Sequence, residues 1–431
     1  MTNPPSAVQP FSLSVSRSDA QMWADFQALC NLGGRLAGST SETAALDFAR
    51  DRLAEVPGAK VRDDPVDYPG WRCRAAQLSD ASTGASLPCT PLLGTASASD
   101  VVAEVLDLGL GRQGDFERHV KDIHGRIVMV RHEYPFASGH MHRRVKLGLA
   151  QRMGAVGFLI VHPEIGIGPV SGSSGRNGGS GIPALGVSAE AADVFRWSPD
   201  GVLPTARMVI DGEDYPARTH MLIADVPGRG PDWVVVSAHI DGHPHGESAI
   251  DNATGVAVAL ALARLLAPHA AEFSRGLRIC LFSAEEWGLA GSRIWLERMQ
   301  AHARRSMVIN FNLDSVGGAT GLTALTSGFE RLDAWIKDTA RLNGLPIATH
   351  LPLMPNSDHA NFAVHGIPAA RLIAGFNAPN SNLRLLLTAA DTRDKVRPDE
   401  LDHALRLAST LTWQALTAAD AMLSSLAIRC D

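Results

Sequence analysis

Cysteine is scarce in this sequence of 431 residues, and its distribution is not typical of a disulfide or metal framework. The five cysteines are Cys30, Cys73, Cys89, Cys280 and Cys430. They are far apart, odd in number and form no Cys-x-x-Cys pair. This pattern argues against a disulfide scaffold and against a cysteine-type zinc site, and it fits reduced thiols in a cytoplasmic protein.

An excess of basic charge and long apolar runs are also lacking. The 39 Lys and Arg residues against 45 Asp and Glu residues give a net charge of -6, which argues against a general affinity for nucleic acid. The nearest approach to the roughly 18 apolar residues of a membrane helix is 256–267, which Arg264 interrupts. Residues 1–14 lack the basic patch and apolar core of a signal peptide. We therefore expect a cytoplasmic protein with neither nucleic-acid nor membrane partners.

The remaining composition is that of a globular protein, with 45% hydrophobic residues and enough length for two or three domains. From about residue 220, apolar runs typical of strands alternate with helical patterns. The expected strands are 233–238, 277–284, 307–313 and 367–375. The expected helices are 252–267, the segment after Trp287, 332–342 and one long helix over 398–426. The alternation predicts an α/β fold whose central sheet is mostly parallel (mixed), with helices on both faces.

Between residues 86 and 210 the pattern changes to short apolar runs separated by short polar helices, expected over 142–153 and 190–195. We interpret this stretch as a compact α+β module. It is inserted into a larger, discontinuous domain that would consist of residues 1–85 and 211–431.

Five potential metal ligands follow one another in the larger domain: His239, Asp251, Glu286, Asp314 and His359. Three of them, His239, Glu286 and Asp314, follow apolar runs where a strand would end. Open α/β sheets form their ligand sites at the carboxyl ends of strands, so we expect these side chains to meet. Histidines with carboxylates suit zinc, with cobalt or manganese as alternatives. Two such ions would lower the pKa of a bridging water and polarise a carbonyl.

Neighbouring residues suggest supporting roles. Asp241 lies two residues after His239, where it could accept the second ring N–H of that histidine. Asp251 opens the next helix and would either bridge two cations or cap the helix. Glu285 and Glu286 point to opposite sides of an extended chain, so one could bind metal while the other acts as a general base.

A family resemblance rests on five segments in order, which cover about residues 220–400. They are SAHIDGHPHGESAIDNATGVAVALALARLL, FSAEEWGLAGS, NLDSVGG, NSDHANFAVHGIPA and ADTRDKV. These segments resemble the successive motifs of the co-catalytic zinc aminopeptidases, whose clan also contains glutamate carboxypeptidase. Residues 86–210 resemble the protease-associated (PA) domain often inserted in these enzymes.

The resemblance implies a zinc-exopeptidase fold, two Zn²⁺ ions per chain and a peptide or small amide substrate. His239 and Asp314 would bind one ion, Glu286 would bind the other, and Asp251 would bridge them. Glu285 would be the general base, and Asp241 would be the partner of His239.

The sequence departs from these relatives at one stretch. They commonly carry Tyr-His-Thr before the last motif, whose His is the fifth ligand and whose Tyr can hold the oxyanion. This chain has Leu386-Leu387-Thr388 there. The ion at Glu286 then needs another ligand, or only one ion binds. His359 is a candidate by chemistry, and so are His243 and His245, although residues of a solvated loop would look the same.

Three functions remain compatible with the sequence. The first is a di-zinc aminopeptidase that removes N-terminal residues from peptides. The second is a carboxypeptidase or amidohydrolase of the same clan, with one or two zinc ions, in which Arg371, Arg384 or Arg393 anchors a substrate carboxylate. The third is a non-catalytic binding protein on a decayed peptidase scaffold. Nothing in the sequence indicates an oligomeric state.

Other motifs have ordinary explanations. Gly109, Gly111 and Gly114 form a GxGxxG pattern, but the next strand begins too soon for a nucleotide-binding crossover, which favours a glycine-rich turn. The His140-Met141-His142 segment has metal-ligand spacing without a nearby third partner, and a polar loop explains it. No GxSxG nucleophile elbow occurs, which argues against that class of serine hydrolase.

Overall fold

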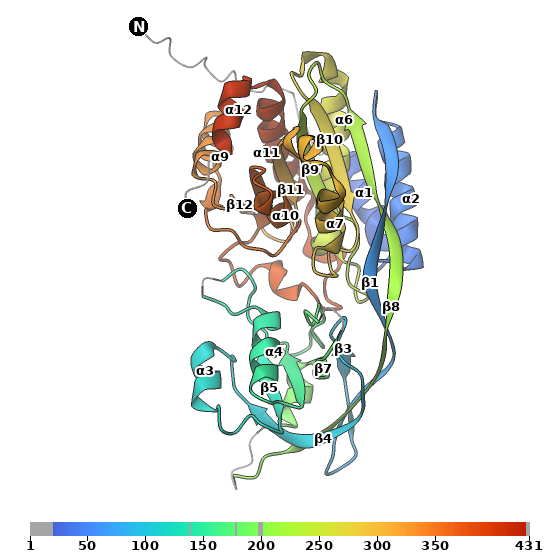
Figure 1. Ribbon diagram of the computed structural model, residues 1–431, viewed down its shortest axis with the longest axis vertical. Helices are drawn as coiled ribbons and strands as arrows, with labels where there is room; N and C mark the ends of the chain where they lie inside the picture. Colours follow the sequence, from blue (N-terminus) through green and yellow to red (C-terminus); the bar gives the residue numbers. More distant parts are fainter. Residues whose placement is uncertain (1–19, 138, 177–178, 197–200, 428–431) are drawn as a thin grey trace.

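The computed structural model describes residues 20–137, 139–176, 179–196 and 201–427, and these form two connected parts (Figure 1). The N-terminal segment 1–14 and Cys430, both used in the sequence interpretation, lie outside the described residues. The other four cysteines are free thiols.

The upper part in Figure 1 contains the expected mixed sheet. The strand order is β13 (Ala348–His350), β12 (Leu322–Leu325), β14 (Ala369–Ala374), β11 (Met307–Leu313), β9 (Trp233–His239), β10 (Gly276–Phe282) and β8 (Thr205–Val226). The pairs β14–β11, β11–β9 and β9–β10 are parallel, so their carboxyl ends meet at one edge of the sheet. The continuous apolar run in β9 is buried, as expected for a central strand covered on both faces.

Helices cover both faces of this sheet (Figure 1). Helix α6 (Thr254–Leu266) contacts β9 and β11 and packs between α1 (Ala20–Asn31) and α11 (Pro398–Thr417). On the opposite face, α10 (His359–Val364) packs against β14, β11 and α7 (Ala290–Arg298). The other helices of this part are α2 (Thr40–Ala54), α8 (Ala301–Arg305), α9 (Glu330–Leu342) and α12 (Asp420–Leu426). The predicted α/β fold class is therefore confirmed.

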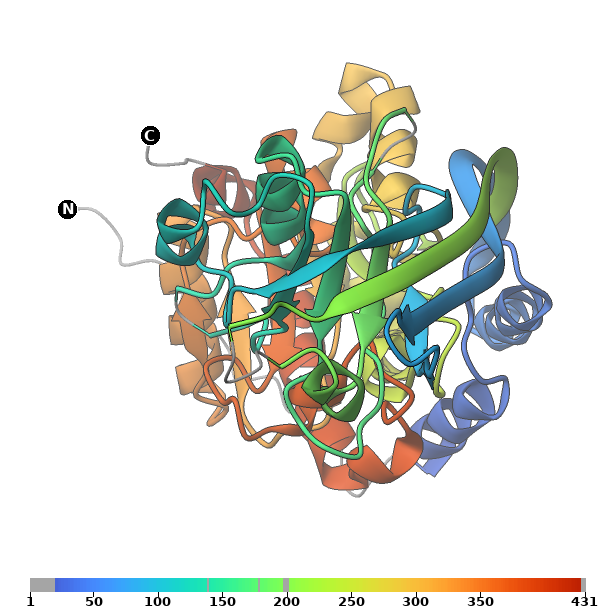
Figure 2. The same ribbon diagram turned by 90° about the horizontal axis from the view of Figure 1, so that it is seen from below.

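The two parts are joined by a long antiparallel ribbon of β1 (Lys60–Asp80) and β8, which Figure 2 shows crossing the inserted module together with β4 (Ala98–Asp107). The sheet continues through the module as β4, β5 (Ile127–Arg131), β6 (Gly157–Val161), β7 (Ala184–Val187) and β3 (Cys89–Pro91), and β2 (Ser86–Leu87) pairs with β1. The predicted boundaries near residues 86 and 210 stay a prediction, because β8 runs through residue 210 without a break.

The module has its own helices and cores. Helices α3 (Gln113–Arg118), α4 (Arg143–Arg152) and α5 (Ala189–Asp193) lie between its strands, and two separate hydrophobic clusters form its interior. The GxGxxG segment is a tight turn, because Gly111 has a φ of 64° and an added Cβ would lie 2.4 Å from Val130 Cγ1.

The prediction of a single helix over 398–426 is wrong, since the helix is interrupted between α11 and α12. At Ala418 the backbone is extended, with φ −62° and ψ 156°. The buried Arg275 guanidinium donates hydrogen bonds to Ala415 O at 3.3 Å and to Ala418 O at 2.7 Å. These bonds satisfy carbonyl groups that the end of a helix leaves without partners, so the break is stable here.

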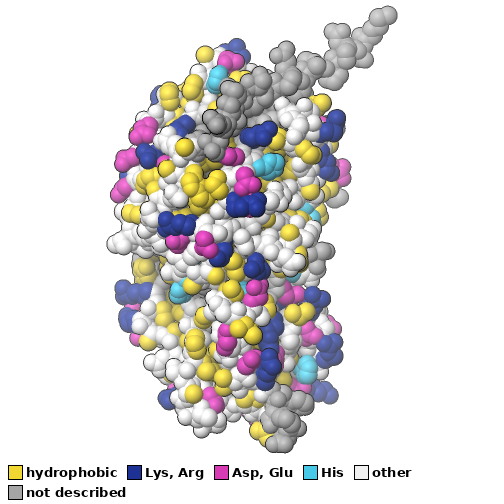
Figure 3. Space-filling model, turned by 180° about the vertical axis from the view of Figure 1, so that it is seen from behind, with side chains coloured by type: hydrophobic (Ala, Val, Ile, Leu, Met, Phe, Trp, Pro, Cys, Tyr) yellow, Lys and Arg dark blue, Asp and Glu magenta, His cyan; other side chains and the backbone are white. Residues whose placement is uncertain are grey.

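One helical stretch of the described residues, Ala249–Glu272, meets the length and composition of a membrane span, with a mean hydropathy of 1.5. It combines η1 (Ala249–Ala253), α6 and η2 (Ala267–Glu272), and 83% of its apolar window is buried inside the protein. Its apolar side chains are therefore explained by their place in the core. On the face seen in Figure 3, acidic and basic side chains are interspersed.

Candidate metal and catalytic site

The strand-end residues meet as the sequence indicated. His239 ends β9, Glu285 and Glu286 follow β10, and Asp314 follows β11, so the carboxyl ends of three adjacent parallel strands supply four side chains. Asp251 reaches the same place from η1, which precedes α6. This is the edge where open α/β sheets form their ligand sites.

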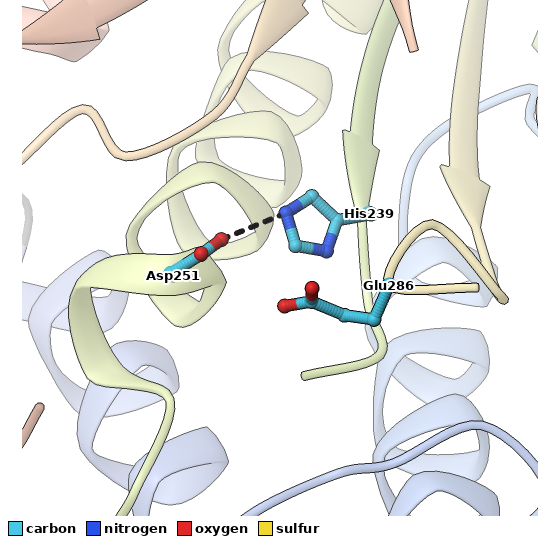
Figure 4. Close-up of side chains that lie close together, drawn as sticks. All are labelled: His239, Asp251 and Glu286. Carbon is cyan, nitrogen blue, oxygen red and sulfur yellow. Dashed lines mark ion pairs between the residues drawn. The ribbon is translucent and has the colours of Figure 1, made fainter. Parts of the chain in front are cut away.

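Two overlapping groups of ligand atoms share His239. His239, Asp251 and Glu286 form one group, and His239, Glu285 and Asp314 form the other, with the chosen atoms of each group within 4.8 Å of one another. His239 Nε2 lies 3.0 Å from Asp251 Oδ1 and 3.6 Å from Asp314 Oδ1. Figure 4 shows the first group converging from β9, η1 and the loop after β10. The arrangement suits two neighbouring cations.

Unusual backbone conformations aim these side chains. Ala284, just before Glu285, has a φ of 56°, and Ser315, just after Asp314, has a φ of 58°. A left-handed conformation at a residue with a Cβ costs about 1–2 kcal/mol. Such strain clusters at functional sites, where the surrounding structure holds it in place.

Asp241 positions the site in two ways. Its backbone carbonyl lies 3.0 Å from His239 Nδ1, whereas its carboxylate is 3.7 Å away. The carboxylate instead accepts hydrogen bonds from the backbone N–H groups of Glu285 and Glu286, at 3.2 Å each. Asp241 is thus the expected neighbour of His239, and it also fixes the chain that carries both glutamates.

Hydrogen bonds and an ion pair hold the Asp314 carboxylate in place. Ser315 Oγ donates to Oδ1 at 3.0 Å, Ser357 Oγ donates to Oδ2 at 2.5 Å, and Arg371 Nη2 lies 3.0 Å from Oδ1. Burial would raise the pKa of Asp314, but Arg371 and His239 outweigh it and hold the pKa below its usual range. The carboxylate is therefore charged and fixed in orientation.

The pKa values of the other titratable groups of the site are also shifted. Burial raises the pKa of Glu285 and of Glu286 well above the usual range, and the negative charges around them add to the effect. For His239, burial would lower the pKa, but the negative charge of Glu285 and the nearby carboxylates of Asp241 and Asp251 raise it well above its usual value. Groups with strongly shifted pKa values in one cavity mark a functional site.

Several buried polar atoms fit a metal ion. His239 Nε2, His243 Nε2 and Glu286 Oε1 are buried and have no hydrogen-bond partner among the described residues. Imidazole nitrogens and carboxylate oxygens are the donors that zinc takes. Cations between these groups would offset the repulsion of the buried carboxylates and satisfy the free lone pairs, so the residues fit the implied zinc ions.

His359 is not brought into either group. It begins α10 and is fully buried, and both of its ring nitrogens are without hydrogen-bond partners among the described residues. Burial lowers its pKa to about 3, and the neighbouring Arg371 contributes to this. A metal-binding role for His359 therefore has no support from the arrangement of the ligand groups.

His243 differs from the solvated loop residue that its sequence context allowed. Only 3% of it is exposed, and its Nε2 lies 2.7 Å from Glu286 Oε2. Burial lowers its pKa to about 4. His245 is exposed and its Nε2 lies 2.8 Å from Thr90 Oγ1, away from the ligand groups. The spacing in His-Pro-His could not distinguish the two positions.

A cavity of about 440 Å³ opens on the site and is shared with the inserted module. The larger domain contributes Asp251, Glu285, Glu286, Asp314 and Leu387, among others. The module contributes the start of α4 and the loop before it, including His140, His142, Arg143 and Arg144. The two histidines of the loop thus face the cavity, a position that their spacing alone did not reveal.

The expected anchors for a substrate carboxylate are already paired. Arg371 is with Asp314, Arg384 Nε lies 3.0 Å from Glu164 Oε1, and Arg393 Nη2 lies 2.8 Å from Glu247 Oε1. Sequence reasoning missed a fourth arginine, Arg143, which is 6% exposed and lines the cavity. The signal available was its place beside His140 and His142 before a helix.

Comparisons with known proteins identify both parts of the chain. Residues 221–412 match peptidase family M28, and residues 92–195 match the PA domain. Aminopeptidase YwaD of Bacillus subtilis is 24% identical over 328 residues, 73% of this chain and 67% of that protein. Human carboxypeptidase Q is 24% identical over 367 residues, 79% of this chain and 74% of that protein.

Among solved structures, BSAP, a zinc aminopeptidase from Bacillus subtilis, shares the fold, with a TM-score of 0.72 at 22% identity over 92% of this chain and 95% of that one. The chain spans 52% to 67% of the length of the first curated relatives that it matches. The M28 match covers the strands that carry the candidate ligands, and the PA match covers the inserted module. Residues 221–412 thus belong to peptidase family M28, and residues 92–195 of the same chain form a PA domain.

Proposed function

We propose that this protein is a zinc-dependent aminopeptidase that binds two Zn²⁺ ions and removes N-terminal residues from peptides. The observation that supports this most is the pair of ligand groups that share His239 at the carboxyl ends of β9, β10 and β11. In this proposal His239 and Asp314 hold one ion, Glu286 holds the other and Asp251 bridges them. Cobalt or manganese could replace zinc by the same donor chemistry.

The zinc ions, when bound, would polarise the scissile carbonyl and lower the pKa of a water molecule, which becomes a strong nucleophile once it loses a proton. Glu285 would take the proton from that water and pass it to the leaving amine. Burial favours this role, because it raises the pKa of Glu285 and lets the group hold a proton between the two steps. Asp241 keeps Glu285 in place through the hydrogen bond from its backbone N–H.

The proposed activity is tested with one peptide in three forms: with a free amine, N-acetylated and C-amidated. We expect hydrolysis of the free-amine and C-amidated forms, and little of the N-acetylated form. Chelation should abolish the activity, and added zinc or cobalt should restore it. Equal cleavage of the N-acetylated form, or activity that survives complete metal removal, would sink the proposal.

A second candidate, a dipeptidase or carboxypeptidase, is favoured by Arg143. This arginine lines the cavity with Glu285 and Glu286, and its Nε donates to Ser173 O at 3.0 Å. No other acceptor for its guanidinium is found among the described residues. A buried guanidinium of this kind can bind a carboxylate through two parallel hydrogen bonds. The similarity to human carboxypeptidase Q is compatible with this candidate.

The variant Arg143→Gln separates the two candidates. For a carboxylate anchor, KM for a dipeptide with a free carboxylate should rise by roughly 10- to 100-fold, the value of a charged hydrogen bond, while the C-amidated form is unaffected. Arg152→Gln, at the exposed end of α4, is the matched control. An equal effect on both substrates would leave the aminopeptidase as the better candidate.

A non-catalytic binding protein is the weaker alternative, because the base and four proposed ligands are kept and lie together. The cytoplasmic location, and the lack of nucleic-acid and membrane partners, remain predictions from composition. Cell fractionation with an antibody against the chain would test the location.

A further inference from the structure

The stretch that departs from the relatives supplies no ligand. Leu387 lines the cavity with an apolar side chain and has a φ of 67°. Thr388 turns its hydroxyl away and donates it to Leu385 O at 2.6 Å. A zinc ion at Glu286 would therefore need a further ligand from another part of the chain.

His243 reaches this position from the loop after β9. Its Nε2 lies 2.7 Å from Glu286 Oε2, yet neither His243 Nε2 nor Glu286 Oε1 has a hydrogen-bond partner of acceptable geometry among the described residues. Both side chains are buried, so these atoms have no solvent to compensate them. The nitrogen His243 Nε2 and the oxygen Glu286 Oε2 thus lie close together without a hydrogen bond, as two ligand atoms of one metal ion would.

The backbone around His243 is firmly held. His243 N donates to Ser248 Oγ at 3.1 Å, and the loop lies directly against Gly34, where an added Cβ would be 2.2 Å from His243 O. Arg35 donates hydrogen bonds to Ile240 O and Ser248 O on either side. The imidazole therefore projects from a fixed base.

A residue of the PA domain connects His243 with the altered stretch. Ser171 Oγ lies 3.5 Å from His243 Nδ1, and Ser171 N donates to Leu387 O at 2.7 Å. Ligating histidines usually engage their second ring nitrogen in this way. With Nδ1–H directed to Ser171, the lone pair of Nε2 faces Glu286.

We propose that His243 is a ligand of the second zinc ion, beside Glu286, and replaces the histidine that relatives carry where this chain has Leu387. Ser171 of the PA domain is the positioning residue that orients the imidazole. The inference rests on the proposed di-zinc function and deepens it, since it completes the ligand set and makes the PA domain part of the metal site.

The test compares zinc binding by the full-length protein and three variants, measured by metal content after dialysis and by chelator competition. Wild type should bind two zinc ions. His243→Ala should keep one and lose affinity for the second by at least the roughly 10- to 100-fold seen when a partner of a ligand is removed. His245→Ala is the matched control and should bind two. His243→Ala/Leu387→His, which restores the relatives' ligand, should recover the second ion.

Unchanged binding of two ions by His243→Ala would overturn the inference and leave the di-zinc function standing. Fewer than two ions in wild type, with the same number in His243→Ala, would overturn both. Equal melting temperatures of the metal-free wild type and variant would confirm that the variant folds.

If His243→Ala does not fold, X-ray absorption of the zinc-loaded wild type decides the matter. Two imidazole nitrogens for each pair of zinc ions are expected, from His239 and His243. A single imidazole for each pair would overturn the inference.

Discussion

At the scale of single residues, the site concentrates more negative charge than its neighbours Arg371 and His239 can neutralise. Four of its five acidic side chains are buried, and the fifth is partly buried; they are Asp241, Asp251, Glu285, Glu286 and Asp314. Buried like charges interact strongly because the interior screens them poorly. The cluster is costly without bound cations, so binding, rather than stability, explains its presence.

Adjacent glutamates provide a matched pair of variants. Glu285→Gln should lower kcat by at least about 10²- to 10⁴-fold, the usual contribution of a general base, while both zinc ions remain bound. Glu286→Gln should instead lose one zinc ion, because it removes a ligand oxygen. Metal content and kcat measured on the same samples check both. If Glu285→Gln keeps substantial activity, Glu285 is not the base.

At the scale of elements, the segment between β9 and α6 carries Asp241, His243 and Asp251. Its backbone is fixed by hydrogen bonds from Arg35. This arginine is fully buried and donates to Ile240 O at 3.1 Å, Glu247 O at 2.9 Å and Ser248 O at 2.8 Å. The loop therefore has a defined shape although it contains no regular strand.

Replacing Arg35 should destabilise the protein. Arg35→Met would leave several buried carbonyl groups without donors, and we expect the free energy of unfolding to fall by about 3 kcal/mol or more. Arg50→Met is the control, because Arg50 forms exposed ion pairs with Asp47 and Asp63 that contribute little. Urea denaturation of the three proteins makes the comparison. Equal losses in the two variants would contradict the role given to Arg35.

A residue in the first turn of α2, Glu42, makes a pH-dependent contribution to the free energy of unfolding. Glu42 is buried and accepts hydrogen bonds from Gly38 N, Thr219 and Ser283. Burial, reinforced by the charge of Asp241, raises the pKa of Glu42 from 4.5 to about 7. The folded protein therefore holds this proton more tightly than the unfolded chain does.

Because the pKa of Glu42 is higher in the folded state, its contribution to stability is fully present below pH 4.5. This contribution is lost as the pH rises through about 7. Glu42→Gln cannot lose a proton, so between pH 4.5 and 8 it should gain about 3 kcal/mol of stability relative to wild type. Unfolding of the metal-free proteins over this pH range is the measurement. Parallel stability curves would refute the assignment.

At the scale of the whole molecule, the PA domain and the peptidase domain share the cavity at the candidate site. Phe136 of the PA domain lies under the Arg371 guanidinium at 5.3 Å, and Tyr134 Oη donates to Gly375 O at 2.5 Å. Arg143 and Ser171 reach the site from the same side. The PA domain thus forms one wall of the cavity, which limits what can reach the candidate ligands.

Metal removal should lower the stability of the folded protein. An ion that binds only the folded state at 100–1,000 times its Kd adds about 3–4 kcal/mol of stability, so chelation should lower Tm by about 3–4 °C for each ion lost. His239→Ala should show no such shift, because both ligand groups depend on it. Thermal melts with and without a chelator give the result. An unchanged Tm in wild type would argue that no ion bridges the strands.

Much of the fold could be predicted because local patterns agree with it. β11 matches the run 307–313, and β9 and β10 begin and end within two residues of the expected runs. The end of α11 could not be predicted, because Arg275, far away in sequence, determines it. The same limit applies to Arg143, whose place in the cavity depends on how the two domains meet.

The sequence by itself determined the α/β class, the family and the order of the candidate ligands, because strand ends and motif spacing are local properties of the chain. Only the tertiary structure decided which histidine lies beside Glu286. His243 and His245 are two residues apart in similar surroundings, and His359 has the same chemistry. Burial and distance separate them, and both depend on packing between segments that are far apart in the sequence.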